Sequence, residues 1–364
     1  MPQDAAIYHS LSPIALDLGF FQIRWYGLSY VLGFVCSYMI LRALAKRRLI
    51  ALPASRVADA MVYIIFGVLI GGRLGYALLG YDPSILWTFT KTFPYWNLLA
   101  INKGGMASHG GMIGVIIAAW FVARGFKTQD GDREGRTTWR HVVDMLALCV
   151  PVGFFFGRIA NFINGELLGR IISPPGQPGP WYSVRFPQEL LGWSSPQAHA
   201  EHTPDLSAPQ HQRLVELVTD GLRPEETWSS GVDRLVAKAA EHRQEIEPIL
   251  SARHPSQLYA ALLEGLAVGI VVWIVAARPR KPGVIGAWWL ISYGLARIID
   301  EVWRMPDAQF VVERPWGLSR GQWFSVPMVV VGIAAVIICS RTRDPLTFGW
   351  ALRPSRPPAE PQGG

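Results

Sequence analysis

Several apolar stretches of this chain approach the roughly 20 residues that a helix needs to cross a lipid bilayer. Examples are residues 61–70, 111–123, 258–277 and 326–339. A helix of a soluble protein repeats its apolar residues about every 3.6 positions and keeps one polar face, whereas these segments are apolar nearly all round. Because a backbone in lipid must satisfy its own hydrogen bonds, and no ten-residue alternating strands occur, we predict an all-α polytopic membrane protein.

We predict about seven membrane-spanning helices, at approximately 27–45, 58–79, 109–124, 141–160, 256–277, 284–303 and 323–340. The formal net charge of +7 is concentrated in the loops that follow the first, third, fifth and last of these spans. Positively charged loops remain in the cytoplasm, so the N-terminus is predicted outside and the C-terminus inside. Because the charge follows the loops, it indicates topology and does not indicate a nucleic-acid partner. Residues 1–21 lack the features of a cleaved signal, so the first span is expected to stay attached.

The composition changes between the fourth and fifth spans, where a run rich in proline and glycine opens a polar segment. Within this segment, residues 210–219 and 232–246 have helical patterns and predict a partly ordered insert. We therefore expect four parts: a first membrane half (1–172), a periplasmic head (173–253), a second membrane half (254–340) and a cytoplasmic tail (341–364).

The second span contains glycines at the spacing that lets two membrane helices approach closely, namely Gly67, Gly71, Gly72 and Gly75. We interpret them as a packing signal. Arg73 lies among them, and two interpretations stay open: it extends to the membrane interface, or it belongs to an anionic site.

Polar residues occur at the end of the fourth span. Polar side chains in a membrane are costly unless they are paired or face a site. Arg158, Asn161 and Gly165 fall at i, i+3 and i+7, so they share one helical face. Glu166 follows where Gly165 is expected to end the helix. Either Arg158 and Glu166 form an ion pair that stabilises the helix end, or the group marks a functional site.

The sixth span has a polar stripe, in which Tyr293, Arg297, Glu301 and Arg304 are spaced i, i+4, i+8 and i+11. Arg297 and Glu301 can pair locally, and Arg304 can extend to the interface. Arg297 and Arg158 come from different helices at similar depth. Two guanidinium groups match phosphate oxygens in geometry and charge, so the pair indicates a phosphate-binding site.

Two further candidates lie near the outer ends of spans. His109 stands in Ser108-His109-Gly110-Gly111, where glycines permit close backbone approach and a neutral imidazole can accept a proton. Tyr26 precedes the first span and either belongs to the interfacial aromatic belt or presents its hydroxyl to a headgroup. The cysteines have no metal-like spacing and no nucleotide-binding motif occurs, so we expect no metal or other cofactor.

At these residues the chain resembles the bacterial prolipoprotein diacylglyceryl transferases. The run 157–170 is similar to the family's signature, and shorter similar segments occur at 24–28, 108–111, 254–259 and 293–297, with Glu301, Arg304, Pro306 and Asp307. Ala160 stands where the family usually has glycine, and Leu168 where it often has tryptophan. The segment 173–253 is longer than is usual in the family.

The resemblance implies a multi-pass protein of the bacterial inner membrane that needs no cofactor. It implies transfer of the diacylglyceryl group of phosphatidylglycerol to the lipobox cysteine of a prolipoprotein, with release of glycerol 1-phosphate. The expected partners are phosphatidylglycerol, the lipobox peptide and membrane lipids. On this hypothesis the catalytic residues are His109, Arg158 and Arg297, and the substrate-binding residues are Tyr26, Asn161, Glu166, Gly169, Tyr293, Glu301 and Arg304.

Some assignments stay open. The proton acceptor for the substrate thiol is His109 or a carboxylate, and Glu166 and Glu301 either orient the arginines or, for Glu301, take part in proton transfer. Two other functional classes are compatible with parts of the pattern. One is a transporter for an anionic metabolite, against which stands the lack of an inverted repeat. The other is an intramembrane hydrolase with Ser108 and His109 as a dyad, which lacks a nucleophile elbow.

Overall fold

The structure, a computed structural model, describes residues 4–19, 22–79, 81–100, 104–194, 203–220, 222, 225–305 and 318–351. The chain divides into two compact units. The first unit comprises Met1–Leu32, Pro151–Gly269 and Ile291–Val330, and the second comprises Gly33–Val150, Ile270–Leu290 and Val331–Gly364.

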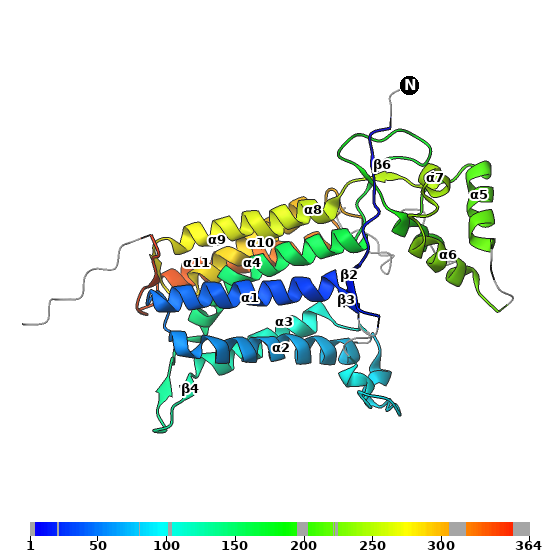
Figure 1. Ribbon diagram of the computed structural model, residues 1–364. Helices are drawn as coiled ribbons and strands as arrows, with labels where there is room; N and C mark the ends of the chain where they lie inside the picture. Colours follow the sequence, from blue (N-terminus) through cyan, green and yellow to red (C-terminus); the bar gives the residue numbers. More distant parts are fainter. Residues whose placement is uncertain are drawn as a thin grey trace, which may run out of the picture. The chain divides into compact units, whose positions relative to one another are not determined.

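Helices occupy all seven ranges that were expected to span the membrane (Figure 1). They are α1 (Trp25–Lys46), α2 (Val57–Leu78), α3 (Ser108–Ala123), α4 (Trp139–Asn164), the succession α8 (Ser256–Ala260), η7 (Ala261–Ala267) and α9 (Val268–Ala276), then α10 (Val284–Asp300) and α11 (Arg320–Ser340). Among the described residues, five helices are long and apolar enough to cross a membrane: Trp25–Lys46, Ala54–Leu78, Trp139–Asn164, Ser256–Ala276 and Gly321–Ser340. The chain is therefore a mostly helical, multi-pass membrane protein.

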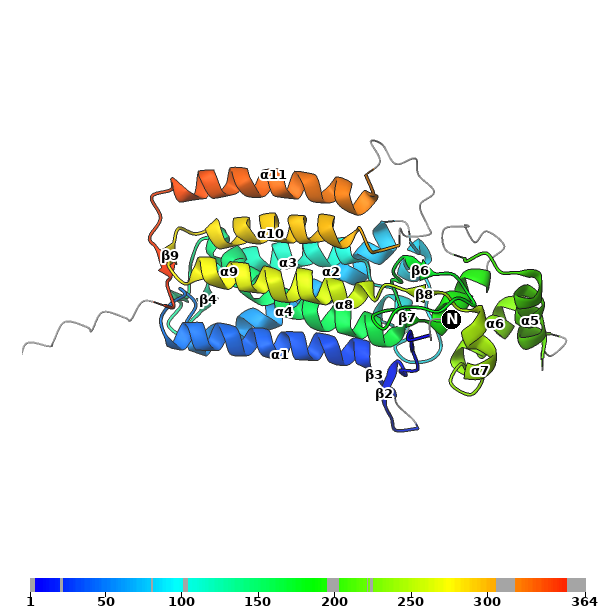
Figure 2. The same cartoon turned by 90° about the horizontal axis from the view of Figure 1, so that it is seen from above.

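In the second unit, α2 and α3 lie side by side in both views (Figures 1 and 2). Their contact is made by glycines. A Cβ atom on Gly67 would lie 2.6 Å from the carbonyl oxygen of Gly114, and one on Gly75 would lie 2.5 Å from the Cα of Gly110. Since no side chain fits between the two backbones, the predicted role of the glycines in helix packing is confirmed.

A buried carboxylate joins two helices of the same unit. Asp144 of α4 accepts hydrogen bonds of 2.7 Å from the backbone N–H groups of Gly283 and Gly286, at the start of α10. A carboxylate at a helix N-terminus satisfies N–H groups that have no partner within the helix. Asp144 therefore fixes the beginning of α10.

The first unit contains a small four-stranded sheet in the order β1 (Ile7–Tyr8), β7 (Val184–Arg185), β8 (Ala252–Arg253) and β6 (Ile171–Ser173). β1 and β7 are parallel, and the other neighbours are antiparallel. The prediction of an all-α chain is incomplete in this respect, because strands of two or three residues are too short to produce an alternating pattern. The other strands of the described residues pair as three two-stranded ribbons: β2 (Ile14–Asp17) with β3 (Gln22–Arg24), β4 (Phe126–Lys127) with β5 (Arg133–Glu134), and β9 (Pro279–Arg280) with β10 (Thr347–Phe348).

Short helices gather near this sheet in both views (Figures 1 and 2): α5 (Ala208–Thr219), α6 (Trp228–Ala237) and α7 (Arg243–Ile246), with the 3₁₀ segment η5 (Pro187–Ser194). They share one apolar core with Tyr8 of β1, formed around the fully buried Leu214, Val232 and Ile246. The helical patterns predicted at 210–219 and 232–246 are thus found in α5 and in α6 and α7, the second of them divided by a turn.

Candidate functional site

The polar end of α4 has the geometry that its sequence predicts. The helix ends at Asn164, and Gly165 adopts a φ of +67°, which favours glycine. The N–H of Gly165 donates to the carbonyl of Phe162 at 3.0 Å, and the N–H of Glu166 donates to that of Asn161 at 3.0 Å. These two bonds form a Schellman cap, so the chain leaves the helix directly after the Arg158–Asn161 face.

Arg158 pairs with a carboxylate that lies 106 positions further along the chain. Its Nε and Nη2 donate to the same oxygen of Glu264, Oε2, at 3.0 and 2.7 Å. The Glu264 side chain is fully buried. The alternative in which Arg158 pairs with Glu166 is therefore wrong, because the guanidinium reaches across to another helix instead of to its own helix end.

Glu264 lies in the π-helical segment η7, a conformation that widens a helix locally and occurs often at functional sites. The neighbouring Gly265 allows α4 to approach, since a Cβ there would lie 2.8 Å from the Cα of Phe155. The close approach and the widened turn bring the Glu264 carboxylate to Arg158.

Glu166 instead organises the segment that follows α4. Its carboxylate accepts hydrogen bonds from the side-chain amides of Asn161, at 2.9 Å, and Asn164, at 3.2 Å. Its backbone carbonyl accepts one from Gln257 at 2.5 Å. The expected orienting role of Glu166 toward Arg158 is corrected accordingly: the residue that Glu166 orients is Asn161.

Arg297 of α10 is surrounded by acidic groups. Its Nη1 donates to Asp300 at 3.0 Å, and its Nη2 lies 2.9 Å from Glu301 Oε2, the local pair that the sixth span predicts. Nη1 also lies 3.8 Å from Oε1 of Glu264. One buried carboxylate, Glu264, thus connects Arg158 and Arg297, two arginines from different helices.

The loop after α4 packs against the end of α10. Gly169 and Arg304 face each other in an isolated antiparallel bridge, and Arg253 donates to the Gly169 carbonyl at 3.0 Å. A Cβ on Gly169 would lie 3.0 Å from the Cβ of His254 and overlap its carbonyl oxygen. No residue larger than glycine therefore fits at position 169. The backbone of Gly169 holds Arg304, which is 9% exposed, at the site.

A small polar cavity of about 10 Å³ adjoins these residues. Its lining consists of Arg158, Leu167, Ser256, Gln257, Ala260, Asp300 and Arg304. A volume of this size holds about one water molecule. The space next to Arg158 is thus bordered by two arginines and Asp300.

The two candidate tyrosines of the first unit differ in position. Tyr293 is on α10, with its ring centroid 5.2 Å from that of Phe154 of α4. Tyr26 begins α1 and is exposed, with its ring 5.5 Å from that of Tyr30. Within the described ranges, no hydrogen bond joins Tyr26 to Arg158 or Arg297. Pro306 and Asp307, two residues of the resemblance, lie outside the described residues.

His109 belongs to the second unit, where it is exposed in the first turn of α3. The start of that helix is tied to α2, because the N–H of Ala107 donates to the carbonyl of Gly72 at 2.9 Å. The contacts that connect Arg158 with Arg297 are all made within the first unit and do not include His109.

Arg73 is bound by the loop before α3, and no acidic side chain pairs with it among the described residues. It is buried, with 6% of its surface exposed. Its guanidinium donates only to backbone carbonyls among the described residues, namely those of Asn97, Leu98, Ala100, Gly104 and Gly105. Because a guanidinium has five N–H donors and these contacts use all of them, Arg73 is a structural residue that holds the loop before α3.

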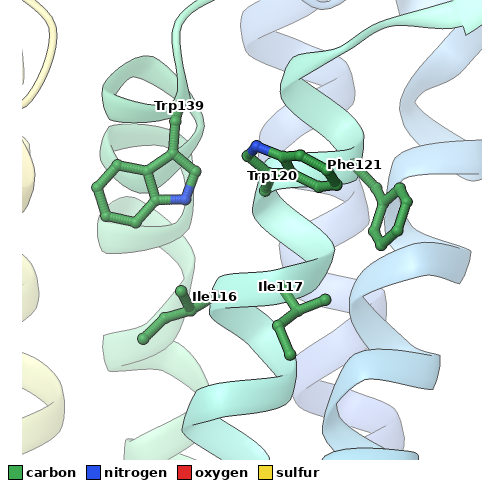
Figure 3. A pocket seen from close by; sticks show the side chains of 5 residues that line it. All are labelled: Ile116, Ile117, Trp120, Phe121 and Trp139. Atoms are coloured by element: carbon green, nitrogen blue, oxygen red, sulfur yellow. The ribbon is translucent and has the colours of Figure 1, made fainter.

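An open groove of about 490 Å³ on the second unit has only apolar walls (Figure 3). Ile116, Ile117, Trp120 and Phe121 of α3 line it together with Trp139 at the start of α4. No lining residue carries an ionisable side chain.

Sequence reasoning missed Glu264 and Asp300, the two carboxylates that complete the arginine cluster. A signal for Glu264 was available. It is the one acidic residue between 258 and 277, an otherwise apolar stretch, and an ionisable residue in such a stretch marks a site by default. Asp300 is seven positions after Tyr293 and three after Arg297, so it lies on the same helical face, and the prediction overlooked it.

Membrane-length helices and a buried cluster of arginines and carboxylates define a multi-pass membrane protein with an ionic cluster in its first unit. The family model for prolipoprotein diacylglyceryl transferase matches residues 13–338. The chain therefore belongs to the prolipoprotein diacylglyceryl transferase family, and it is a transferase.

Similar proteins cover nearly the whole chain. A phosphatidylglycerol–prolipoprotein diacylglyceryl transferase of Bdellovibrio bacteriovorus is 38% identical over 354 residues, which is 94% of this chain and 96% of the relative. A protein of the same name from an Azoarcus species is 36% identical, covering 90% of this chain and 95% of its own length. Another from Burkholderia orbicola is 34% identical, covering 93% and 97%.

Proposed function

We propose that this protein transfers the diacylglyceryl group of phosphatidylglycerol to the lipobox cysteine of a prolipoprotein, forming a thioether and releasing glycerol 1-phosphate. The names of its relatives give the donor and the acceptor. The observation that carries the proposal is that Arg158 and Arg297 converge on one buried carboxylate, because two guanidinium groups at one place can bind a phosphate.

The reaction makes one bond and breaks one. The cysteine sulfur attacks the diacylglyceryl carbon that bears the phosphate ester, a C–S bond forms, and the C–O bond to the phosphate breaks. The thiol proton passes to a base and then to water. The phosphodiester carries one negative charge and the departing monoester carries up to two. Arginines aimed at the phosphate therefore interact more strongly as charge develops, which is electrostatic catalysis.

In this proposal Arg158 and Arg297 bind the phosphate. Asn161, oriented by Glu166, and Tyr26 add hydrogen bonds to the headgroup. Further residues shape the substrate site: Gly169, Tyr293, Glu301 and Arg304. Glu301 orients Arg297, since its carboxylate lies 2.9 Å from that guanidinium.

The substrate thiol has an ordinary pKa of about 8.5, so it needs a proton acceptor at neutral pH. His109 is our first candidate, since its exposed imidazole at the start of α3 is accessible to substrate. A carboxylate of the arginine cluster is the second. No step requires a metal or an organic cofactor.

We further propose seven spans in the bacterial inner membrane, with the N-terminus outside and the C-terminus in the cytoplasm. The proposal is supported by α3 and α10, which are helices at the two remaining predicted ranges, by the apolar composition of α3, and by the alternation of positive loops. Residues 173–253 then form a periplasmic head between two membrane halves, followed by a cytoplasmic tail. The lipobox peptide and the membrane lipids meet near the outer leaflet.

The test is to incubate the purified protein with phosphatidylglycerol and a lipobox peptide and to analyse the peptide by mass spectrometry. We expect the mass of one diacylglyceryl group on the peptide and free glycerol 1-phosphate in equal amount. A peptide with serine in place of cysteine is the control and should gain nothing. Uptake of a labelled anion into proteoliposomes without thioether formation would favour a transporter instead.

A further inference from the structure

The carboxylate of Glu264 lies between the two arginines to which the proposed function assigns the substrate phosphate. Its Oε2 already receives two hydrogen bonds from Arg158. Its Oε1 is buried, has no hydrogen-bond partner among the described residues, and lies 3.8 Å from Nη1 of Arg297. A planar anion thus already occupies the space between the two guanidinium groups.

We propose that Glu264 is an internal competitor of the phosphate, a positioning residue that keeps Arg158 and Arg297 together, weakens donor binding and promotes release of the glycerol phosphate. This inference rests on the proposed function, because it assigns the competing anion to phosphatidylglycerol and its product.

The charges of the cluster explain why a competitor is needed. Arg158 and Arg297 form ion pairs with three carboxylates, those of Glu264, Asp300 and Glu301. The Arg158 and Arg297 side chains are only 18% and 15% exposed, and unpaired cations at such buried positions are costly. Glu264 therefore stabilises both arginines in a phosphate-binding arrangement. An arriving phosphate exchanges with its carboxylate and does not have to assemble the site.

Arg158 has capacity for this exchange. Nε and Nη2 both bind one carboxylate oxygen, and within the described part of the chain Nη1 donates to no acceptor. The polar cavity beside Arg158 is bordered by Arg304 and Asp300 and can admit an oxygen atom. A phosphate can thus bind Arg158 from the side of the cavity before the Glu264 carboxylate releases its hydrogen bonds with Arg158.

The competition acts more strongly on the product than on the donor. Electrostatic repulsion is proportional to the product of the two charges, so a monoester with two negative charges is repelled by Glu264 twice as strongly as a diester with one. Glu264 consequently lowers product affinity more than donor affinity. An enzyme that must release a highly charged product from two arginines benefits from this difference.

The test uses Glu264→Gln, which keeps the size of the side chain and removes its charge. If the change tightens donor binding about tenfold, equivalent to about 1.4 kcal/mol, the same Coulomb argument predicts that inhibition by glycerol 1-phosphate tightens about a hundredfold. Both values come from the peptide assay, as the KM for phosphatidylglycerol and the inhibition constant of the product. A larger KM with unchanged or weaker product inhibition would overturn the proposal, since a purely structural role predicts that outcome.

Two further variants keep the test decisive. Glu189→Gln removes the same charge from another fully buried pair of the first unit, with Arg253 at 2.6 Å. It should lower thermal stability without tightening product inhibition. Glu264→Asp retains the charge and should leave the ratio of product to donor affinity within about threefold of the wild type. A change of about tenfold in that ratio for Glu264→Asp, as large as the change expected for Glu264→Gln, would contradict the role of the charge.

Protection against thermal unfolding by glycerol 1-phosphate separates this inference from the proposed function. If the wild type forms no thioether but Glu264→Gln still gains stronger protection, the transfer reaction is wrong and the competition stands. If the wild type forms the thioether and Glu264→Gln gains no protection, the competition is wrong and the transfer reaction stands.

Discussion

Arg158 donates two hydrogen bonds to a single oxygen of Glu264, across 106 positions of sequence and between two helices. The pair joins α4 to the π-helical turn that precedes α9, and Glu264 extends the connection to Arg297. This relationship sets the geometry of the whole cluster.

Replacing Arg158 by alanine should destabilise the protein in addition to removing activity. The change leaves Glu264 buried without its main partner, and breaking a buried pair costs about 3–5 kcal/mol. The double variant Arg158→Ala/Glu264→Gln should recover much of the stability and none of the activity. Thermal unfolding in detergent and the peptide assay measure the two effects. A double variant no more stable than Arg158→Ala would show that the pair is not the cause.

Replacing Glu301 by glutamine should have a modest effect. Arg297 keeps its 3.0 Å contact with Asp300, so its guanidinium remains oriented. We expect the transfer rate to fall by about tenfold at most, which corresponds to about 1.4 kcal/mol for the loss of one of the two ion pairs that Arg297 forms on its own helix. Asp300→Asn is the matched comparison on the same arginine. A loss of a thousandfold or more for Glu301→Gln would instead assign proton transfer to Glu301.

Replacing Gly169 by alanine should damage the site through packing alone. The added Cβ overlaps the carbonyl of His254, and overpacking of this kind costs about 1–3 kcal/mol. Gly153→Ala is the control, because a Cβ at Gly153 meets no heavy atom within 4 Å. We expect lower thermal stability and lower transfer for Gly169→Ala, and neither for Gly153→Ala. Equal behaviour of the two variants would exclude the steric explanation.

His9 should make the stability of the first unit depend on pH. Burial lowers the pKa of His9 below its ordinary value of 6.5, and its Nε2 lies 2.8 Å from the carbonyl of Phe162. The unfolded chain therefore binds a proton more readily than the folded protein. The contribution of His9 is fully present above pH 6.5 and is lost as the pH falls from 6.5 toward the folded pKa.

Unfolding temperatures measured at several pH values between 7.5 and 5 test this expectation. The wild type should lose stability over that interval, and His9→Asn should lose less, because it has no group that titrates there. A steeper pH dependence in His9→Asn than in the wild type would contradict the assignment.

The helices were predictable because their apolar runs are long and nearly free of charge. Each predicted span lies within a few residues of an observed helix, and Gly165 ends α4 as its position indicates. The glycines of α2 were equally informative, since only close packing explains their spacing. These are local properties, and a single stretch of sequence contains them.

The partners of the arginines were not predictable in the same way. Glu166 is eight positions from Arg158 and was a natural candidate, yet α4 directs the guanidinium to Glu264 on another segment. Arg73 gave no signal that five backbone carbonyls would surround it. The strands of the four-stranded sheet are two or three residues long and depend on pairing between distant segments. Such long-range contacts form only when distant segments fold together, so no single stretch of sequence predicts them.

The most direct measurement of the central claim is transfer of the diacylglyceryl group to a lipobox peptide by three proteins, the wild type, Arg158→Ala and Ser108→Ala, followed by mass spectrometry. The phosphate-binding role of Arg158 predicts diacylglyceryl peptide from the wild type and from Ser108→Ala, and none from Arg158→Ala even when its folded fraction is matched. Loss of the product in Ser108→Ala, together with its retention in Arg158→Ala, would contradict the account.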